Sequence, residues 1–242
     1  MKAVVLCAGV GSRLGALTNE LPKPLLDVGG VPLLGRILKN LARAGVVDVG
    51  INVHHHGRAV SDFVGDGTRF GVRVRCVEEK RLSGTAGGAK RAAALFSPAR
   101  DDPDEPLLVH YGDILTDHDL AALQLRHTVR AATATILVHR RAGSNSIVDV
   151  DADDRVVGFV ERPMTTSMEL TWVFSGIAVL SAAAVAALPD GGDIPRDVLI
   201  PMVHAHAALF AAPLTGSRYA IDSPARLAGA NDAVVRGEYR GA

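Results

Sequence analysis

Residues 2–14, KAVVLCAGVGSRL, decide the fold, because an apolar run ends there in a glycine-rich loop that is followed by an arginine. Residues 21–25, LPKPL, come shortly afterwards and hold Lys23 between two prolines. A buried strand that runs into such a loop leaves backbone N–H groups free to bind phosphate. Arg13 and Lys23 add two fixed cations that can neutralise charge at a reacting phosphate. The stretch therefore predicts a nucleoside triphosphate site at the first turn of an α/β fold.

Lysine is rare in this chain, which makes Lys23 informative. The sequence holds 26 lysines and arginines together, and only five of them are lysines. Lysine carries a compact, point-like charge, whereas arginine presents a planar fork of donors. In a chain that prefers arginine, a lysine held between two prolines indicates that the compact charge is needed at that place.

Composition narrows the class of protein. The chain has 242 residues, is 48% hydrophobic and carries a formal net charge of zero. These values predict a single domain over residues 1–242 with a sizeable core. No basic stripe favours nucleic acid, and neither a polybasic tail nor an apolar run of about 20 residues favours a membrane. Cys7 and Cys76 lie in apolar runs, and no signal peptide precedes the first strand, so a reducing, cytoplasmic location is expected.

Apolar strands alternate with helical patterns in the first half of the chain, which is typical of a mostly parallel sheet. Strands are expected at residues 2–7, 47–53, 72–77, 107–111 and 134–139. Helices are expected at residues 32–44, 57–63, 86–95 and 117–125. This alternation predicts a nucleotide-binding half over residues 1–140.

The pattern changes in the second half. Residues 147–150 and 156–161 favour a hairpin with an acidic turn, and residues 172–180 a further strand. An alanine-rich helix, a helix at 195–206, a short strand at 209–213 and a last helix from about Ser223 follow. The whole sequence therefore predicts a three-layer α/β/α, Rossmann-like fold with a mixed, mostly parallel sheet. Residues 141–242 add a small antiparallel portion that could cover a substrate.

Three known patterns of phosphate-binding loop can be compared with residues 9–14. A dinucleotide fingerprint requires a third glycine where this chain has Leu14, and no acidic residue follows at the expected distance. A P-loop requires Gly-Lys-Ser/Thr, which is absent. The third pattern is Gly-x-Gly-Ser/Thr-Arg-Leu followed by Pro-Lys-Pro, and it fits at each position. The alternative without function is a glycine turn that only lets a strand meet a helix.

With this third pattern the chain resembles the sugar-1-phosphate nucleotidylyltransferases of the short bacterial type. Members of that family join a nucleoside triphosphate and a sugar 1-phosphate into a nucleotide sugar and pyrophosphate. The resemblance extends over residues 2 to about 232. Its further motifs are Gly84-Thr85-Ala86-Gly87 after Glu78-Glu79, then Gly112-Asp113, Glu161-Arg162-Pro163, Ser175-Gly176-Ile177 and Tyr219-Ala220-Ile221-Asp222-Ser223-Pro224.

The resemblance implies a role for each matching residue. The nucleotide would contact Ala8, Gly9, Gly11, Ser12, Glu78, Gly84, Thr85 and Ala86. The acceptor would contact Gly112, Glu161, Arg162, Phe174 and Gly176. The catalytic residues would be Arg13, Lys23 and Asp113, and a magnesium ion would be held by Asp113 and Asp222.

Charge explains why transfer of a nucleotidyl group needs these residue types. Two anionic substrates repel each other, so positioning and charge neutralisation supply most of the acceleration. We expect Arg13 at the β- and γ-phosphates and Lys23 at the α-phosphate. Mg²⁺ prefers hard oxygen ligands, which favours Asp113 and Asp222 as its carboxylates.

Both aspartates have structural alternatives. Asp113 at a strand end is also suited to cap a turn or a helix. Asp222 precedes Ser223 and Pro224, a pattern that is also typical of a helix start, where Asp222 would be the N-cap. Asp222 is the best second metal ligand that this region offers.

Two departures from the family pattern concern the acceptor. Arg162 replaces the usual lysine, which keeps the charge but favours bidentate phosphate contact. Phe174 stands where sugar-binding members often carry asparagine, which removes an amide that reads hydroxyl groups. The departures favour an unusual sugar or a sugar-like cyclitol phosphate. The alternative is that Phe174 only faces the core.

The resemblance leaves three functions and several substrates open. A mild preference for GTP follows from the short guanylyltransferases that the chain resembles. A cytidylyltransferase for phosphocholine or another small phosphomonoester is the first alternative, and Ile221-Asp222 supports it. A non-catalytic regulatory domain of the same fold is the second. Neither a nucleic acid nor a membrane is expected as a partner, and a monomer and a homodimer both remain possible.

Overall fold

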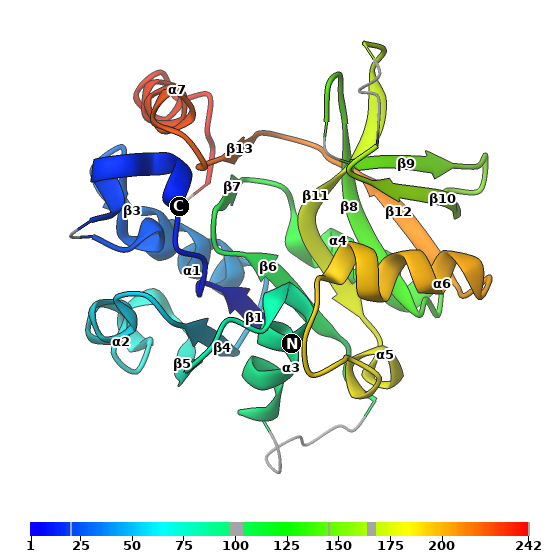
Figure 1. The fold of residues 1–242 in the computed structure, drawn as a ribbon, viewed down its shortest axis with the longest axis horizontal. Coiled ribbons are helices and arrows are strands. Elements are labelled where there is room, and N and C mark those ends of the chain that lie inside the picture. Colours follow the sequence, from blue (N-terminus) through cyan, green and yellow to red (C-terminus); the bar gives the residue numbers. More distant parts are fainter. Residues whose placement is uncertain (20, 97–103, 145, 164–167, 242) are drawn as a thin grey trace.

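The computed structural model describes residues 1–19, 21–96, 104–144, 146–163 and 168–241 (Figure 1). Within these residues, nine strands form one sheet in which β10-β9-β11-β6-β1-β4-β5 are successive neighbours and β8 lies between β11 and β12. The strands are β1 (Lys2–Leu6), β4 (Asp48–Val53), β5 (Arg73–Glu78), β6 (Leu107–Tyr111), β8 (Ala134–Arg141), β9 (Ser146–Val150), β10 (Val156–Glu161), β11 (Thr171–Leu180) and β12 (Leu209–Pro213).

The sheet is mixed, with its parallel core at the N-terminal end of the chain. Strand β1 pairs in parallel with β4 and β6, β4 with β5, and β12 with β8. Strand β11 runs antiparallel to β6, β8 and β9, and β9 and β10 form the expected hairpin. Two small antiparallel sheets join β2 (Asp27–Val28) to β3 (Val31–Pro32) and β7 (Ile114–Thr116) to β13 (Arg218–Ala220). The predicted fold class is confirmed.

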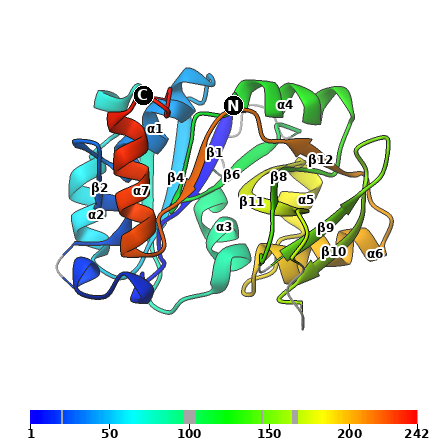
Figure 2. The same cartoon turned by 90° about the horizontal axis from the view of Figure 1, so that it is seen from above.

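Helices cover both faces of the sheet, which gives three layers (Figure 2). Along β1, Ala3 and Val5 face one core while Val4 faces the other, because successive strand side chains point to opposite faces. The first core is covered by α1 (Leu33–Arg43), α2 (Gly57–Val64), α4 (Leu120–Val129) and α7 (Pro224–Val235). The second is covered by α3 (Gly84–Ala94), α5 (Ala182–Ala186) and α6 (Ile200–His204).

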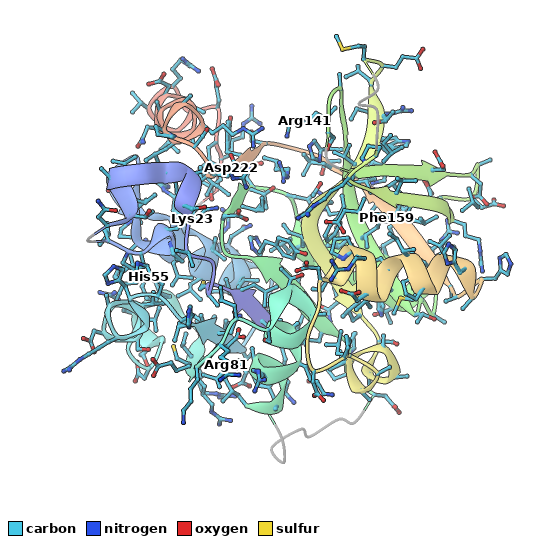
Figure 3. The ribbon with its side chains drawn as sticks, in the orientation of Figure 1. Lys23, His55, Arg81, Arg141, Phe159 and Asp222 are labelled. Atoms are coloured by element: carbon cyan, nitrogen blue, oxygen red, sulfur yellow. The ribbon has the colours of Figure 1, made fainter. Side chains whose placement is uncertain are left out.

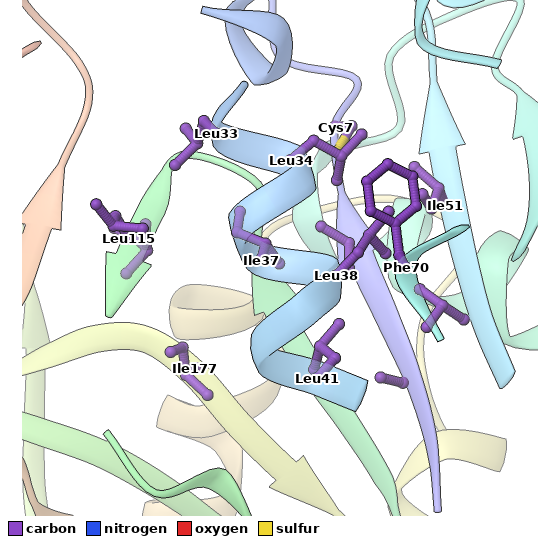
Figure 4. Close-up of a cluster of buried hydrophobic side chains, with 14 of the residues drawn as sticks. Cys7, Leu33, Leu34, Ile37, Leu38, Leu41, Ile51, Phe70, Leu115 and Ile177 are labelled. Carbon is purple, nitrogen blue, oxygen red and sulfur yellow. The ribbon is translucent and has the colours of Figure 1, made fainter. Parts of the chain in front are cut away.

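Helix α1 shows why the first core forms. Its leucines and isoleucine recur every three or four residues, so they lie on one face of the helix, which packs against the sheet (Figure 4). Leu34, Leu38 and Leu41 are fully buried. The helix ends before Gly45, which adopts a left-handed conformation with φ 79°. Truncation of one such leucine to alanine would cost about 2–5 kcal/mol.

The observed elements differ from the expected ones mainly at their ends. The helix expected at 117–125 begins at Leu120, because the Asp119 carboxylate caps it by accepting from the N–H groups of Ala121 and Ala122. The helix expected at 195–206 is divided into a π-helical turn, η4 (Ile194–Leu199), and α6. Pro201 marks this division, since proline has no N–H to continue a helix. No helix in the described ranges is long and apolar enough to cross a membrane.

The parallel core sets the place of the candidate site. Strands β1, β4 and β6 are neighbours and run in the same direction, so their carboxyl ends meet at one edge of the sheet. The glycine-rich loop leaves β1 there, Asn52 lies near the end of β4, and Gly112-Asp113 follow β6. This edge is where open α/β sheets bind their ligands.

Candidate active site

A cavity of about 260 Å³ lies beside the glycine-rich loop, and we call it the glycine-loop cavity. Four residues predicted to bind the nucleotide line it: Ala8, Gly9, Gly84 and Thr85. Lys23, Gly112 and Asp113 also line it, although Gly112 was predicted to contact the acceptor. The remaining predicted nucleotide contacts, Gly11, Ser12, Glu78 and Ala86, are not among its lining residues.

Gly11 has a structural part in this loop. It adopts a left-handed conformation, with φ 72°, where the chain turns into the 3₁₀ helix η1 (Ser12–Thr18). A Cβ at this position would lie 3.3 Å from the Cβ of Lys23. Glycine therefore allows the loop to pass close to Lys23 without strain.

A second cavity, of about 350 Å³, adjoins the first, and we call it the arginine cavity. It is lined by Arg13, His139, Arg141, Phe174, Gly176, Arg218, Asp222 and Arg226, among others. Tyr111 and Asp113 line both cavities. A group bound at Asp113 would thus be in reach of ligands in both spaces.

Lys23 and Asp113 form an ion pair at this shared boundary. The Lys23 Nζ donates to the Asp113 Oδ2 at 2.7 Å, and the two side chains are 11% and 29% exposed. The Asp113 carboxylate therefore points at the lysine, and the chain continues from it into β7, where no helix begins. Asp113 therefore does not cap a helix.

Asp222 is brought beside Asp113 by the pairing of β13 with β7. The N–H of Ile221 donates to the carbonyl oxygen of Asp113 at 2.8 Å, which makes Asp222 the next residue along (Figure 3). The Asp222 carboxylate pairs with Arg13 at 3.1 Å and with Arg226 at 2.7 Å. The N-cap of α7 is Ser223, whose hydroxyl accepts from the N–H of Arg226. Asp222 is thus free of the capping role.

The two aspartates fit a magnesium ion. Within the described residues no group of three or more histidine, cysteine or carboxylate side chains is arranged to hold a metal by itself. Mg²⁺ is commonly bound by one or two carboxylates together with phosphate oxygens of the substrate. Asp113 and Asp222 line the same cavity and supply such a pair of hard oxygen ligands.

Sequence reasoning missed the polar network on the other side of the glycine-loop cavity. Asn52 is 3% exposed, and its Oδ1 accepts from the N–H of Cys7 at 3.0 Å while its Nδ2 donates to the Glu79 Oε1 at 2.6 Å. The other carboxylate oxygen of Glu79 accepts from the N–H of Ser83 at 3.0 Å. The network fixes the glycine-rich loop against the segment that precedes α3.

Glu79, and not Glu78, is the glutamate of the cavity. Glu78 is the last residue of β5 and is exposed, whereas Glu79 is 3% exposed and lines the cavity. Successive residues of an extended chain point to opposite sides, so only one of the two adjacent acids can face inward. The expectation for Glu78 is corrected accordingly.

Asp193 is a further lining residue that the sequence did not indicate. Its carboxylate accepts from the N–H of Thr85 at 3.1 Å, and the Thr85 hydroxyl accepts from the N–H of Ile194 at 2.8 Å. Gly84 has φ 75°, and a Cβ there would lie 2.3 Å from the carbonyl oxygen of Gly192. The Gly-Thr-Ala loop is therefore held by a segment more than a hundred residues away, so periodicity gave no signal for it.

The predicted acceptor contacts divide into two groups. Phe174 and Gly176 line the arginine cavity, and the Phe174 ring packs edge-to-face on Tyr111 with centroids 5.8 Å apart. Glu161 and Arg162 line neither cavity. Arg162 is exposed and has φ 52°, and burial together with Asp193 raises the pKa of Glu161. The structure thus brings Phe174 to the cavity and leaves Arg162 outside it.

Basic side chains dominate the arginine cavity. Burial lowers the pKa of Arg218 to about 10, so its guanidinium is still charged at neutral pH. His139 lies beside it with a pKa lowered to about 4 by burial and by Arg218 and Arg141, so its ring is neutral. The His139 Nδ1 is 2.9 Å from the Ser175 hydroxyl. Arg218, His139 and Arg141 were not predicted, because they become part of a site only through the pairing of β8 with β11 and of β13 with β7.

Comparison with protein families agrees with this geometry. A family model described as nucleotidyl transferase matches residues 2–190. The match covers more than half of the 242 residues, and the chain therefore belongs to the nucleotidyl transferase family. This confirms the family that the glycine loop and Pro-Lys-Pro predicted.

Curated relatives are sugar-1-phosphate nucleotidyltransferases. The mannose-1-phosphate guanylyltransferase of Mycobacterium tuberculosis is 30% identical over 194 residues, which are 79% of this chain and 52% of that protein. The N-acetylmuramate alpha-1-phosphate uridylyltransferase of Neisseria meningitidis is 42% identical over 123 residues, 50% of this chain and 51% of that protein. The chain spans about half the length of the curated relatives it matches.

A solved structure supports the fold. HddC from Yersinia pseudotuberculosis, crystallised with GMP-PN, superposes with a TM-score of 0.78 at 21% identity, over 96% of this chain and 99% of that one. At this identity the likeness shows the fold alone.

Proposed function

We propose that this chain is a sugar-1-phosphate nucleotidylyltransferase, which joins a nucleoside triphosphate to a sugar 1-phosphate or a sugar-like cyclitol phosphate. The observation that carries the proposal is the Lys23–Asp113 ion pair at the boundary of the two cavities. The nucleoside and its α-phosphate would occupy the glycine-loop cavity, and the β- and γ-phosphates would reach Arg13 in the wall of the arginine cavity. The acceptor would occupy the rest of the arginine cavity. Residues 1–140 and 141–242 would then be the nucleotide and acceptor halves of one domain.

The reaction places a phosphate oxygen of the acceptor in line with the α-phosphorus. A bond forms between that oxygen and the phosphorus as the bond from the phosphorus to pyrophosphate breaks, and pyrophosphate leaves. Lys23 would bind the α-phosphate and Arg13 the β- and γ-phosphates, so both exchange a carboxylate partner for phosphate oxygens. Fixed cations of this kind stabilise developing charge without reorganising at the moment of reaction.

Magnesium would fit Asp113 and Asp222, since these exchanges release Asp113 from Lys23 and the Oδ2 of Asp222 from Arg13, while the Oδ1 of Asp222 still pairs with Arg226. Asp113 and Asp222 would hold it, and when bound it would supply positive charge to the phosphate oxygens. The Asn52–Glu79 network would keep the cavity wall in place around the nucleoside. A reaction that consumes nucleoside triphosphate is consistent with the cytoplasmic location that we propose.

The nucleobase is proposed from relatives. GTP is our first candidate, in line with the mannose-1-phosphate guanylyltransferase that is 30% identical. UTP is the second, because the N-acetylmuramate alpha-1-phosphate uridylyltransferase is 42% identical over half of this chain. Phosphocholine is disfavoured as acceptor, because its quaternary ammonium would face several guanidinium groups.

The test is a matrix of nucleotides and acceptors. Pyrophosphate release would be measured with ATP, CTP, GTP, TTP and UTP, each with a panel of sugar 1-phosphates, phosphocholine and Mg²⁺. Thermal shifts with each nucleotide alone would report binding separately, since a specific ligand stabilises the folded state by mass action. If the protein bound a nucleotide but released no pyrophosphate with any combination of substrates, the non-catalytic regulatory domain would be favoured. The same preparation would show whether the chain is a monomer or a homodimer.

A further inference from the structure

The arginine cavity continues into a third space of about 500 Å³, which we call the side cavity. His139, Arg141, Arg218 and Arg226 line both spaces. Asp113, where the glycine-loop and arginine cavities meet, does not line the side cavity. The side cavity therefore extends the acceptor space away from the point of phosphate transfer.

The side cavity has more positive charge than the reacting phosphates need. No carboxylate in the described part of the chain lines it, and Asp222 in the adjoining arginine cavity is already paired with Arg13 and Arg226. Over the described residues, neither Arg141 nor Arg218 takes part in an ion pair. The two guanidinium groups thus face the acceptor space without a carboxylate in direct contact, although the charges of Asp113 and Asp222 act on Arg218 from further away.

Arg218 is held in place beside other guanidinium groups at the wall of the side cavity. The Arg218 Nε donates to the carbonyl oxygen of Ser175 at 3.1 Å, which fixes the side chain partly buried in the wall. Asp113 and Asp222 raise the pKa of Arg218, whereas Arg141 and Arg226 lower it, as like charges do. Like charges held together in a partly buried place are stabilised when an anion binds between them.

We propose, on the basis of the function proposed above, that the acceptor carries a second anionic group and that Arg141 and Arg218 bind it at the side cavity. That group is a carboxylate or a second phosphate on the sugar-like ring, apart from the phosphate that is coupled. Arg141 ends β8 and Arg218 begins β13, so the two guanidinium groups come from different strands. Such a pair recognises a planar or tetrahedral oxyanion through several N–H donors.

The test compares matched acceptors by binding and by turnover. Glucose 1-phosphate is the neutral-ring reference, glucuronic acid 1-phosphate adds a carboxylate, and glucose 1,6-bisphosphate adds a phosphate. Titration calorimetry at matched ionic strength would measure the affinity for each acceptor. An acidic acceptor is expected to bind at least about tenfold more tightly than glucose 1-phosphate. The acidic acceptor that binds tighter identifies whether the second group is a carboxylate or a phosphate.

Variants connect the preference to the two arginines. Arg141→Gln is expected to reduce the ratio of acidic to neutral affinity about tenfold, and Arg141→Lys to keep part of it because the charge stays. Arg218→Gln repeats the test from the other strand. Arg58→Gln is the control, since Arg58 is 94% exposed on α2 and lines none of these cavities.

The outcomes separate this proposal from the proposed function. Equal affinity for the three acceptors, or an equal loss for all three in Arg141→Gln, would overturn the second anionic group and assign both arginines to the coupled phosphate. A selective loss of acidic acceptors without pyrophosphate release from any nucleotide would sustain it and reject the transferase activity. Because binding is measured without turnover, the affinities test the second anionic group and pyrophosphate release separately tests the transferase activity.

Discussion

The Nζ of Lys23 lies 2.7 Å from the Oδ2 of Asp113, although the two residues are 90 positions apart in the chain. The lysine comes from the 3₁₀ turn η2 (Lys23–Leu25) and the aspartate from the turn between β6 and β7, so the ion pair joins the first loop to the middle of the sheet. Its place between two cavities makes it the centre of the proposed reaction.

Replacing Lys23 with alanine is expected to lower kcat about 100-fold or more, because a fixed cation at the α-phosphate is lost. Circular dichroism would check that the variant is folded. Lys39→Ala is the matched control, since Lys39 is an exposed lysine of α1. Near-normal turnover in folded Lys23→Ala protein would remove Lys23 from the mechanism.

Asp222→Asn is expected to raise the Mg²⁺ concentration for half-maximal rate about tenfold, because an amide oxygen binds the ion less well than a carboxylate. The measurement is the rate against Mg²⁺ at saturating nucleotide. Asp62→Asn, at an exposed position of α2, should leave the curve in place. A lower rate with an unmoved Mg²⁺ dependence would mean that Asp222 acts through Arg13 or Arg226 instead.

Asn52→Leu is expected to destabilise the protein by about 1–3 kcal/mol, since it removes the side-chain acceptor of the Cys7 N–H and the donor to the Oε1 of the buried Glu79. Urea denaturation would measure the loss. Asn19→Ala, at an exposed asparagine, should change the free energy of unfolding by less than about 0.5 kcal/mol. If the two variants were equally stable, the network would contribute nothing.

Two glycines of the cavity should behave differently. A Cβ at Gly84 would lie 2.3 Å from the Gly192 carbonyl oxygen at a φ of 75°, so Gly84→Ala should cost about 1–3 kcal/mol of stability. A Cβ at Gly9 meets no atom within 4 Å, so Gly9→Ala should keep its stability and weaken nucleotide binding about tenfold. Thermal melting with and without nucleotide distinguishes the two. Unchanged nucleotide affinity in Gly9→Ala would contradict the proposed phosphate loop.

Stability should fall in mild acid partly because of His110, which is 1% exposed and has a pKa lowered to about 4 by burial. The His110 ring binds a proton more readily in the unfolded chain than in the folded one. The resulting loss of stability is absent above about pH 6.5 and grows as pH falls towards 4. At about pH 5 it amounts to roughly 2 kcal/mol. Urea denaturation of wild type and His110→Asn at about pH 7.5 and pH 5 would test it, and an equal drop in both would contradict it.

Much of the fold could be predicted from sequence because its signals are local. The apolar run before Gly9 predicted β1, the three-to-four-residue spacing of leucines predicted α1, and Gly45 marked its end. The predicted helix ends were less accurate where a side chain determines the end, as Asp119 does for α4. Loop residues with a family pattern, such as Lys23 and Asp113, were found in the same local way.

By itself, then, the sequence determined the fold class, the family, and the cations and carboxylates at the glycine-loop edge. Only the tertiary structure decided which of two adjacent glutamates faces the cavity, which partner Asp222 takes, and that Arg141 and Arg218 meet at the acceptor space. The physical reason is range. Helix and strand periodicity and capping act over a few residues, whereas strand order and register bring together residues from distant segments that carry no mark of their future neighbours.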